Sequence, residues 1–361
     1  MNDPVDLLIT NVRFPDAPFQ EPGSLLVRDG RIAAVGETDV AMHNGDGRYE
    51  VLDAGGGIVV PGMVDTHRHT WQAVVRGLCG DMSAIQYLQS IRWGVARHFT
   101  ADDVYTGTYV GALDMLDGGV TQVVDFSHCM NSPDHADAAY EALAASGIRA
   151  TFAYGFNAVP GDSVAFRSHD ERIADFRRVV DTYRGRNELI TVGVALSDFN
   201  QTDLDTLRTE IAVAREAQVP ITLHPGALRP RTPYGTVTLL HEAGLLGPDM
   251  ILAHCTNATG DELRFVRDAG AWVSCTPETE MQMGMGFPKI GKLRELGMKP
   301  TLGVDVVSDC SGDLFAQARL ALQTERALIH RDGMLEHIPL TARDVLRWPP
   351  SSGPRRPGAQ G

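Results

Sequence analysis

The stretch IVVPGMVDTHRH (58–69) decides the fold, because an apolar run is followed there by two histidines with one residue between them. Isoleucine and valine favour extended backbone, and residues i and i+2 of a strand point to the same side. We therefore predict a buried strand over residues 58–65. His67 and His69 follow at its carboxyl end, with both imidazoles facing one point.

Seven further short apolar runs follow, with amphipathic helical stretches such as 133–146 and 202–217 between them. Alternating strands and helices imply parallel strands, and eight such units close into a barrel. A doubly wound open sheet is the rival architecture, but no GxGxxG motif follows the first strand. The predicted fold class is α/β, a (β/α)8 TIM-like barrel with strands at 58–65, 120–126, 149–156, 189–196, 219–225, 250–255, 271–277 and 300–306.

The residues before this barrel follow a different pattern. DLLITNVRF and SLLVRDGRIAAVG alternate apolar and polar residues, and Asp29-Gly30 is typical of a hairpin turn. We predict that residues 1–57 form a small, partial β-sandwich and that residues 58–348 form the barrel. The tail, residues 349–361, is rich in proline, glycine and serine and is predicted to be disordered.

Composition narrows the classes of partner. Of the 361 residues, 43% are apolar, and the net charge is −14. A nucleic-acid partner would need a basic surface, which this acidic chain lacks. No apolar run reaches the ~18 residues of a membrane span. The first residues, MNDPVDLLITNV, show neither a positively charged region nor an apolar one, so we expect no secretory signal. The five scattered cysteines include no CxxC pair. We therefore predict a cytoplasmic protein with a small-molecule substrate and neither a nucleic-acid nor a membrane partner.

Polar residues end several of the predicted strands at the same level. His67 and His69 follow the first strand, His224 ends the fifth, His254 ends the sixth and Asp305 ends the eighth. Active sites of such barrels lie at the carboxyl ends of the strands. A lone histidine at a strand end is usually a structural residue. Five polar residues at matching ends instead favour one shared site.

Imidazole and carboxylate ligands suit Zn²⁺, with Fe²⁺ as the alternative. A metal held by His67, His69, His224 and Asp305 would lower the pKa of a bound water to about 7. Asp305 would also accept a proton from that water, and His254 would orient the water or polarise the bond under attack. The sequence therefore predicts a metal-dependent hydrolase.

PGMVDTHRH, LHPG, LAHC and LGVD, in this order, resemble the amidohydrolase superfamily over roughly residues 5–348. The chain is most similar to the branch of cytosine and guanine deaminases and s-triazine hydrolases and chlorohydrolases. The resemblance implies the same four ligands and His254 as their catalytic neighbour. It also suggests a homo-oligomer. Other members bridge two metals with a carboxylated lysine after strand four, but the first lysine here is Lys289. We therefore expect a single divalent metal.

Two departures from the family pattern affect the expected chemistry. Deaminases of this branch usually carry glutamate three residues after the strand-five histidine, where this chain has Ala227. Glu278 and Glu280, after the seventh strand, are candidate replacements. The family also continues beyond the helix at 340–348 into strands that complete the N-terminal sandwich. A truncated C-terminus would leave the N-terminal strands unpaired, and we expect reduced stability.

Two further residues are candidates for substrate contacts. Gln72 matches a substrate-binding glutamine of guanine deaminases, and His128 ends the second strand on the side of the site. The leading function is hydrolysis of a C–N bond in a small cyclic or heterocyclic substrate. A nucleobase-like deaminase is the first alternative. A truncated, catalytically impaired relative that only binds metal or ligand is the second.

Overall fold

The computed structural model of the chain describes residues 6–15, 22–36, 49–159, 164–198, 202–228, 235–331, 333–334 and 336–346. It divides into two compact units, residues 1–61 and 62–361. The division falls four residues after the predicted boundary at residue 57. The predicted disordered tail, 349–361, lies outside the described residues.

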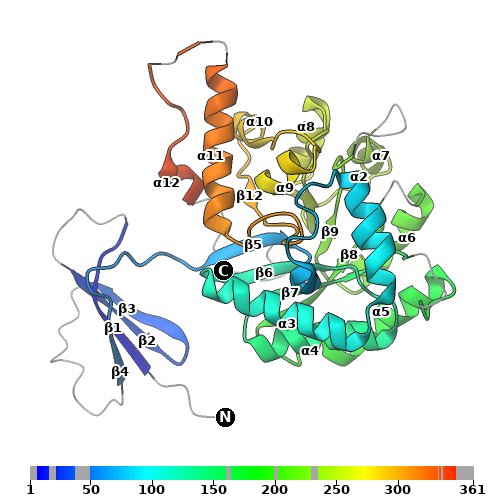
Figure 1. The fold of residues 1–361 in the computed structure, drawn as a ribbon, viewed down its shortest axis with the longest axis horizontal. Coiled ribbons are helices and arrows are strands. Elements are labelled where there is room, and N and C mark those ends of the chain that lie inside the picture. Colours follow the sequence, from blue (N-terminus) through cyan, green and yellow to red (C-terminus); the bar gives the residue numbers. More distant parts are fainter. Residues whose placement is uncertain are drawn as a thin grey trace. The chain divides into compact units, whose positions relative to one another are not determined.

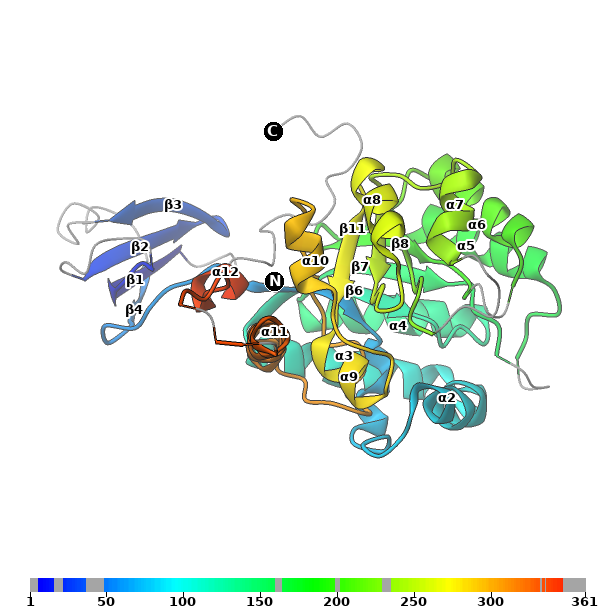
Figure 2. The ribbon, with the colours of Figure 1, turned by 90° about the horizontal axis from the view of Figure 1, so that it is seen from above.

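The first unit contains a four-stranded sheet in the order β3-β2-β1-β4. Its strands are β1 (Asp6–Val12), β2 (Gly23–Arg28), β3 (Arg31–Gly36) and β4 (Tyr49–Asp53). The hairpin predicted at Asp29-Gly30 joins β2 to β3, and both residues have positive φ, 49° and 70°. Figure 2 shows the four strands as one layer. The partial β-sandwich expected from the sequence is therefore present as one four-stranded sheet.

The second unit is the predicted eight-stranded parallel barrel (Figure 1). The strands follow the order β12-β11-β10-β9-β8-β7-β6-β5, and a parallel bridge between Arg68 and Asp305 joins the two ends of that order. Their bounds are β5 (Met63–Arg68), β6 (Val120–Ser127), β7 (Arg149–Gly155), β8 (Ile190–Ala195), β9 (Ile221–Leu223), β10 (Met250–Ala253), β11 (Trp272–Cys275) and β12 (Thr301–Leu302).

The first barrel strand begins later than predicted. Pro61 cannot donate a ladder hydrogen bond, and Ile58 pairs instead with Arg13 in the N-terminal unit. As a result β5 starts at Met63 and continues through His67. The difference places His67 within the hydrogen-bonded strand rather than after it.

A buried hydroxyl cluster ties the closing strands together beneath the site. Thr66 Oγ1 on β5 lies 2.7 Å from Ser274 Oγ on β11 and 2.8 Å from Thr301 Oγ1 on β12. Buried hydroxyls are stable only when they are hydrogen-bonded, and each of these has a partner. The cluster therefore fixes the register of β5 against β11 and β12, directly below His67.

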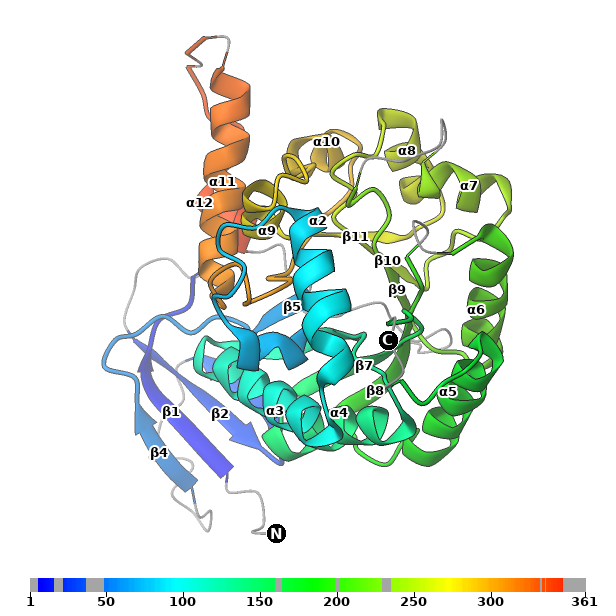
Figure 3. The same ribbon diagram turned by 45° about the vertical axis from the view of Figure 1, so that its right-hand side comes forward.

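Helices surround the strands (Figure 3). Local signals set their ends: Thr100 and Asp103 form a capping box at the start of α3, and Gly147, with φ 76°, ends α4. The main helices are α3 (Ala101–Asp117), α4 (Pro133–Ser146), α5 (His169–Tyr183), α6 (Leu204–Glu216), α7 (Thr236–Glu242), α8 (Gly260–Asp268), α9 (Pro277–Gln282), α10 (Ile290–Glu295), α11 (Leu314–His330) and α12 (Ala342–Leu346). None of the described helices is long and apolar enough to span a bilayer.

A helical segment after β5 crosses the carboxyl end of the barrel. It consists of η1 (Thr70–Val75), α2 (Ala84–Tyr87), the π-helical η2 (Leu88–Val95) and η3 (Ala96–His98). At one end the Ala84 amide donates to Met283 O, beyond β11. At the other end Asn131 Nδ2, beyond β6, donates to Ala96 O over 2.8 Å. Residues 84–98 therefore form a roof over the strand ends.

Candidate active site

Three imidazoles converge at the carboxyl end of the barrel. His67 lies in β5, His69 directly follows that strand, and His224 follows β9. His67 Nε2 lies 3.2 Å from His224 Nε2. One ligand atom from each of the three histidines lies within 4.8 Å of the others, so the group can hold a metal ion.

Asp305 adds a carboxylate to the same point. Its Oδ1 atom lies 3.3 Å from His67 Nε2 and 3.2 Å from His69 Nε2. The residue has a left-handed φ of 70°, which is costly for a non-glycine residue. Two backbone hydrogen bonds hold it there: the Asp305 amide donates to His67 O, and Asp305 O accepts from the His69 amide. The closing of the barrel thus positions this carboxylate.

His254 completes the cluster from β10. Its Nε2 atom is 3.8 Å from Asp305 Oδ2, and it can share a metal with His67 and Asp305. On the far side of the ring, Nδ1 lies 3.0 Å from Thr276 Oγ1 and 3.5 Å from Glu280 Oε1. His254 also has a left-handed φ, 70°. The structure therefore brings together all five polar strand-end residues singled out in the sequence.

The outer nitrogens of two imidazoles show which atoms remain to bind a metal. His69 Nδ1 lies 2.8 Å from Phe126 O, and His224 Nδ1 lies 2.8 Å from Asp198 Oδ1. A carbonyl or carboxylate oxygen only accepts, so each Nδ1 carries the proton and each Nε2 keeps a lone pair. Metal-binding histidines are usually oriented in this way. The donor set therefore fits a divalent cation of the Zn²⁺ or Fe²⁺ kind.

Burial keeps these three imidazoles neutral. It lowers the pKa of His67 to about 4 and also lowers the pKa values of His69 and His224. Burial opposes ionisation of Asp305 as well. However, the charge of His254 and the side chains of His67 and His69, whose Nε2 atoms contact Asp305 Oδ1, hold the pKa of Asp305 well below its usual range. Neutral imidazoles and an ionised carboxylate are the forms that bind metal.

The pKa of His254 moves in the opposite direction. Burial lowers it, but the Asp305 charge and the hydrogen bond and charge of Glu280 outweigh burial and raise it. His254 is thus the imidazole of this cluster best suited to carry a proton.

Gln72 and His128 lie beside the cluster. Gln72 Nε2 donates to Tyr87 OH over 2.6 Å, and Gln72 Oε1 accepts from Ser308 Oγ over 2.7 Å. The His128 ring stacks on that of His69, with centroids 3.8 Å apart. Trp71 Nε1 donates to His128 Nδ1 over 3.0 Å. Both residues are buried, and their roles as substrate contacts stay predictions.

The structure separates the two glutamates proposed to replace the missing one. Ala227 lies in the loop after β9, where its carbonyl accepts from Asn257 Nδ2. Glu280 is fully buried beside His254. Glu278 is bonded to Gln317 and Ser311, at 2.8 and 2.9 Å from its Oε2 atom, and contributes no atom to the cluster.

Sequence reasoning did not single out Asp198. This residue follows β8 and holds His224, while Asn157 Nδ2 donates to its Oδ2 atom over 2.9 Å. An acidic residue directly after a barrel strand was the available signal.

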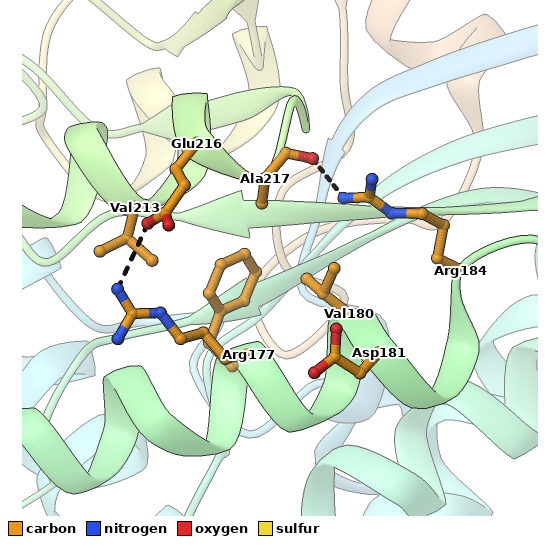
Figure 4. Close-up of a pocket in the computed structure, with 8 residues that line it drawn as sticks. Arg177, Val180, Asp181, Arg184, Val213, Glu216 and Ala217 are labelled. Atoms are coloured by element: carbon orange, nitrogen blue, oxygen red, sulfur yellow. Dashed lines mark hydrogen bonds and ion pairs between the residues drawn. The ribbon is translucent and has the colours of Figure 1, made fainter.

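A separate hollow lies between α5 and α6 on the outside of the barrel (Figure 4). Its volume is about 460 Å³, and Arg177 pairs with Glu216 at 3.3 Å across it. Arg184 donates to Ala217 O at its other end. None of the predicted site residues lines this hollow.

Comparison with known proteins gives deaminases as relatives. The chain is 33% identical over 300 residues to a 5-methylthioadenosine/S-adenosylhomocysteine deaminase of Symbiobacterium thermophilum, covering 81% of this chain and 66% of that protein. It is 26% identical over 369 residues to a 5'-deoxyadenosine deaminase of Methanosarcina mazei, covering 98% of this chain and 81% of that protein. The chain thus spans about two thirds of the first relative's length.

Solved structures share the fold. An adenosine deaminase from Xanthomonas campestris with bound zinc matches with a TM-score of 0.80 at 23% identity, covering 91% of this chain and 75% of that one. Guanine deaminase from C. acetobutylicum with bound guanine matches with a TM-score of 0.81 at 17% identity, covering 95% and 84%.

The family assignment comes from the sequence of the barrel unit. Residues 58–348 match the Amidohydrolase family, the family that the four quoted motifs resemble. The match covers most of the chain and includes all five residues of the cluster. The chain therefore belongs to the amidohydrolase family and is a hydrolase of the class that acts on carbon–nitrogen bonds.

Proposed function

We propose that this chain is a metal-dependent deaminase, which replaces an exocyclic amino group of a heterocyclic ring by a hydroxyl group and releases ammonia. The observation that carries the proposal is the convergence of His67, His69, His224 and Asp305, with His254 beside them. The deaminase relatives favour an exocyclic amine over a ring amide.

The four proposed ligands are His67, His69, His224 and Asp305. Zn²⁺ is the proposed metal because three imidazole nitrogens and one carboxylate suit it, and Fe²⁺ is the alternative. A bound metal would supply a water molecule acidified enough to act as nucleophile at neutral pH. No lysine precedes Lys289 to bridge a second ion, so the proposed site holds one metal.

Asp305 and His254 would share the proton transfers. Asp305 accepts a proton from the attacking water as the new C–O bond forms at the ring carbon. His254 polarises the ring and helps carry a proton to the amine, so that the C–N bond breaks and ammonia leaves. The two side chains are close enough for this, with His254 Nε2 3.8 Å from Asp305 Oδ2.

Glu280 supports His254 where the usual glutamate is absent. Its Oε1 atom is 3.5 Å from His254 Nδ1 and also accepts from the Thr276 amide over 2.9 Å. A carboxylate behind an imidazole fixes the ring and stabilises its protonated form. In this proposal His254 carries out the proton transfer that the usual glutamate performs and that Ala227 cannot.

The site would operate in the cytoplasm. All five cysteines are free and buried, and burial raises the pKa of the Cys129 thiol to about 12. Buried thiols of high pKa are unreactive and persist in a reducing compartment.

Ammonia release tests the function. Chelator-treated protein is reloaded with Zn²⁺, Fe²⁺ or Mn²⁺ and offered aminopurines, aminopyrimidines and cyclic ureas. We expect metal-dependent ammonia release from at least one amino heterocycle and none from Asp305→Asn, which should remain folded. Hydrolysis of the cyclic ureas alone would indicate a ring-opening amidohydrolase. Full activity of Asp305→Asn, or no turnover by any loaded form, would overturn the proposal.

A further inference from the structure

Arg92 is a buried cation in the roof over the site. It lies on η2 and is 4% exposed. Its Nη1 atom is fully buried and has no hydrogen-bond partner among the described residues. Two other deeply buried arginines differ in this respect. Arg68 pairs with Asp65 and Asp114, and Arg172 Nη1 donates to Met130 O over 2.8 Å.

The roof brings Arg92 to the carboxyl ends of the strands. Residues 84–98 are tied to Met283 beyond β11 and to Asn131 beyond β6, on either side of the site. Tyr87, one helical turn before Arg92, bonds to Gln72. Arg92 thus belongs to a segment that is tied to both sides of the site and, through Tyr87, to Gln72 beside the cluster.

The charge of Arg92 interacts with Asp198, the carboxylate that holds His224. Arg92 is therefore near a residue that touches one of the proposed ligands.

A buried charge without a dedicated partner is costly for the folded chain. Removing a guanidinium from water costs several kcal/mol unless a paired anion compensates. Asp198 offsets part of that cost, but it is hydrogen-bonded to His224 and Asn157 rather than to Arg92. An arginine kept in this state suits an anionic ligand, because its planar fork of donors matches a carboxylate.

We propose that Arg92 binds a carboxylate carried by the heterocyclic substrate. The inference deepens the proposed function, on which it rests for the ring and its position beside the metal. The substrate class becomes an amino heterocycle with an acidic substituent. Arg92, in the roof, binds that acidic substituent, and the ring lies between the roof and the histidines.

Paired ligands that differ only in charge test the proposal by binding. Nicotinate and nicotinamide form one pair, and pyrazine-2-carboxylate and pyrazine-2-carboxamide form the second. Dissociation constants are measured by calorimetry on zinc-loaded wild type, Arg92→Met, Arg92→Lys and the control Arg172→Met. We expect the wild type to prefer the carboxylate at least about tenfold, since a charged partner roughly doubles the strength of a hydrogen bond. Arg92→Met should lose that preference, Arg92→Lys should keep part of it, and Arg172→Met should keep it.

Thermal stability separates a binding role from a structural one. Replacing an unpaired buried cation by methionine should leave Tm unchanged or raise it, whereas Arg172→Met should lower Tm because Met130 O loses its donor. A lower Tm for Arg92→Met with an unchanged carboxylate preference would overturn the proposal. So would equal affinity of the wild type for the two members of both pairs, including no binding of either.

The two proposals can fail separately. A carboxylate preference that depends on Arg92, without ammonia release from any ring, would refute the deaminase and support the Arg92 site. Equal deamination of neutral and carboxylated rings by wild type and Arg92→Met would support the deaminase and refute the Arg92 site. A preference that survives in Arg92→Met would assign the carboxylate to the metal.

Discussion

Glu278 and Glu280 are close in sequence on one helix but make different contacts. Both lie in the first turn of α9, two positions apart, and therefore point in different directions. Glu280 reaches His254, while Glu278 bonds to Gln317 and Ser311. Of these two carboxylates, Glu280 is therefore the one that supports His254, the proposed proton carrier.

Replacing Glu280 by glutamine should impair turnover more than binding. Glutamine keeps the shape but removes the charge behind His254, so we expect kcat to fall about 10- to 100-fold with KM changed less than about threefold. Steady-state kinetics on the best amino heterocycle measure both constants. Glu278→Gln is the matched control and should stay within about threefold of the wild type. Equal losses in the two variants would assign Glu280 a purely structural role.

Glu210 on α6 makes stability depend on pH. It is fully buried, and burial raises its pKa from 4.5 to about 7 against hydrogen bonds from the Ser197 amide and hydroxyl. The folded chain then holds a proton between pH 4.5 and 7 that the unfolded chain has released. The stabilisation is fully present below pH 4.5 and is lost as pH rises through about 7.

Glu210→Gln should remove that dependence. Relative to the variant, the wild type should lose on the order of 2–3 kcal/mol of unfolding free energy between pH 5 and pH 8. Urea unfolding at both pH values measures this difference. Glu216→Gln, at an exposed position of the same helix, should follow the wild type. Parallel curves for wild type and Glu210→Gln would show that the buried carboxyl does not titrate in this range.

At the scale of elements, the packing of α3 against η1 positions the residues beside the ligands. Gly107 and Gly111 let the two backbones approach closely. A Cβ at Gly107 would lie 2.2 Å from Trp71 O, and one at Gly111 would lie 2.7 Å from Thr70 O. Because these neighbours are backbone atoms directly after His69, they cannot move without moving η1.

Gly107→Ala should therefore destabilise the chain although alanine favours helix. Overpacking costs about 1–3 kcal/mol, against about 1 kcal/mol gained in helix propensity. We expect Tm to fall and the zinc affinity to weaken as η1 shifts. Thr106→Ala, an exposed change on the same helix, should leave both values unchanged. A Tm for Gly107→Ala at or above that of the wild type would show that the contact is looser than described.

The barrel and its strand ends could be predicted from the sequence because both depend on local pattern. An apolar run ending in histidine or aspartate marks a strand and its carboxyl end, as at His224 and Asp305. The predicted start of β5 was wrong because Pro61 interrupts the strand and Ile58 pairs with Arg13 in the N-terminal unit. The local sequence pattern does not show that pairing. Glu280, Asp198 and Arg92 could not be ranked, because their importance comes from burial and from partners distant in sequence.

At the scale of the whole molecule, barrel closure assembles the site. Parallel pairing of Arg68 with Asp305 brings the first and last strands together, so that His67, His69 and Asp305 share one point. His224 follows β9 and His254 follows β10, and both of these strands lie between β5 and β12 in the chain. A site built in this way requires the folded barrel, and its four proposed ligands leave room for one ion.

Zinc titration of the metal-free chain tests this account most directly. Calorimetry with chelator-treated protein should give one equivalent of Zn²⁺ per chain, and His69→Ala should lose most of that affinity while keeping the far-ultraviolet circular dichroism of the wild type. Two equivalents, no binding, or unchanged affinity in His69→Ala would contradict the single-metal site formed by His67, His69, His224 and Asp305.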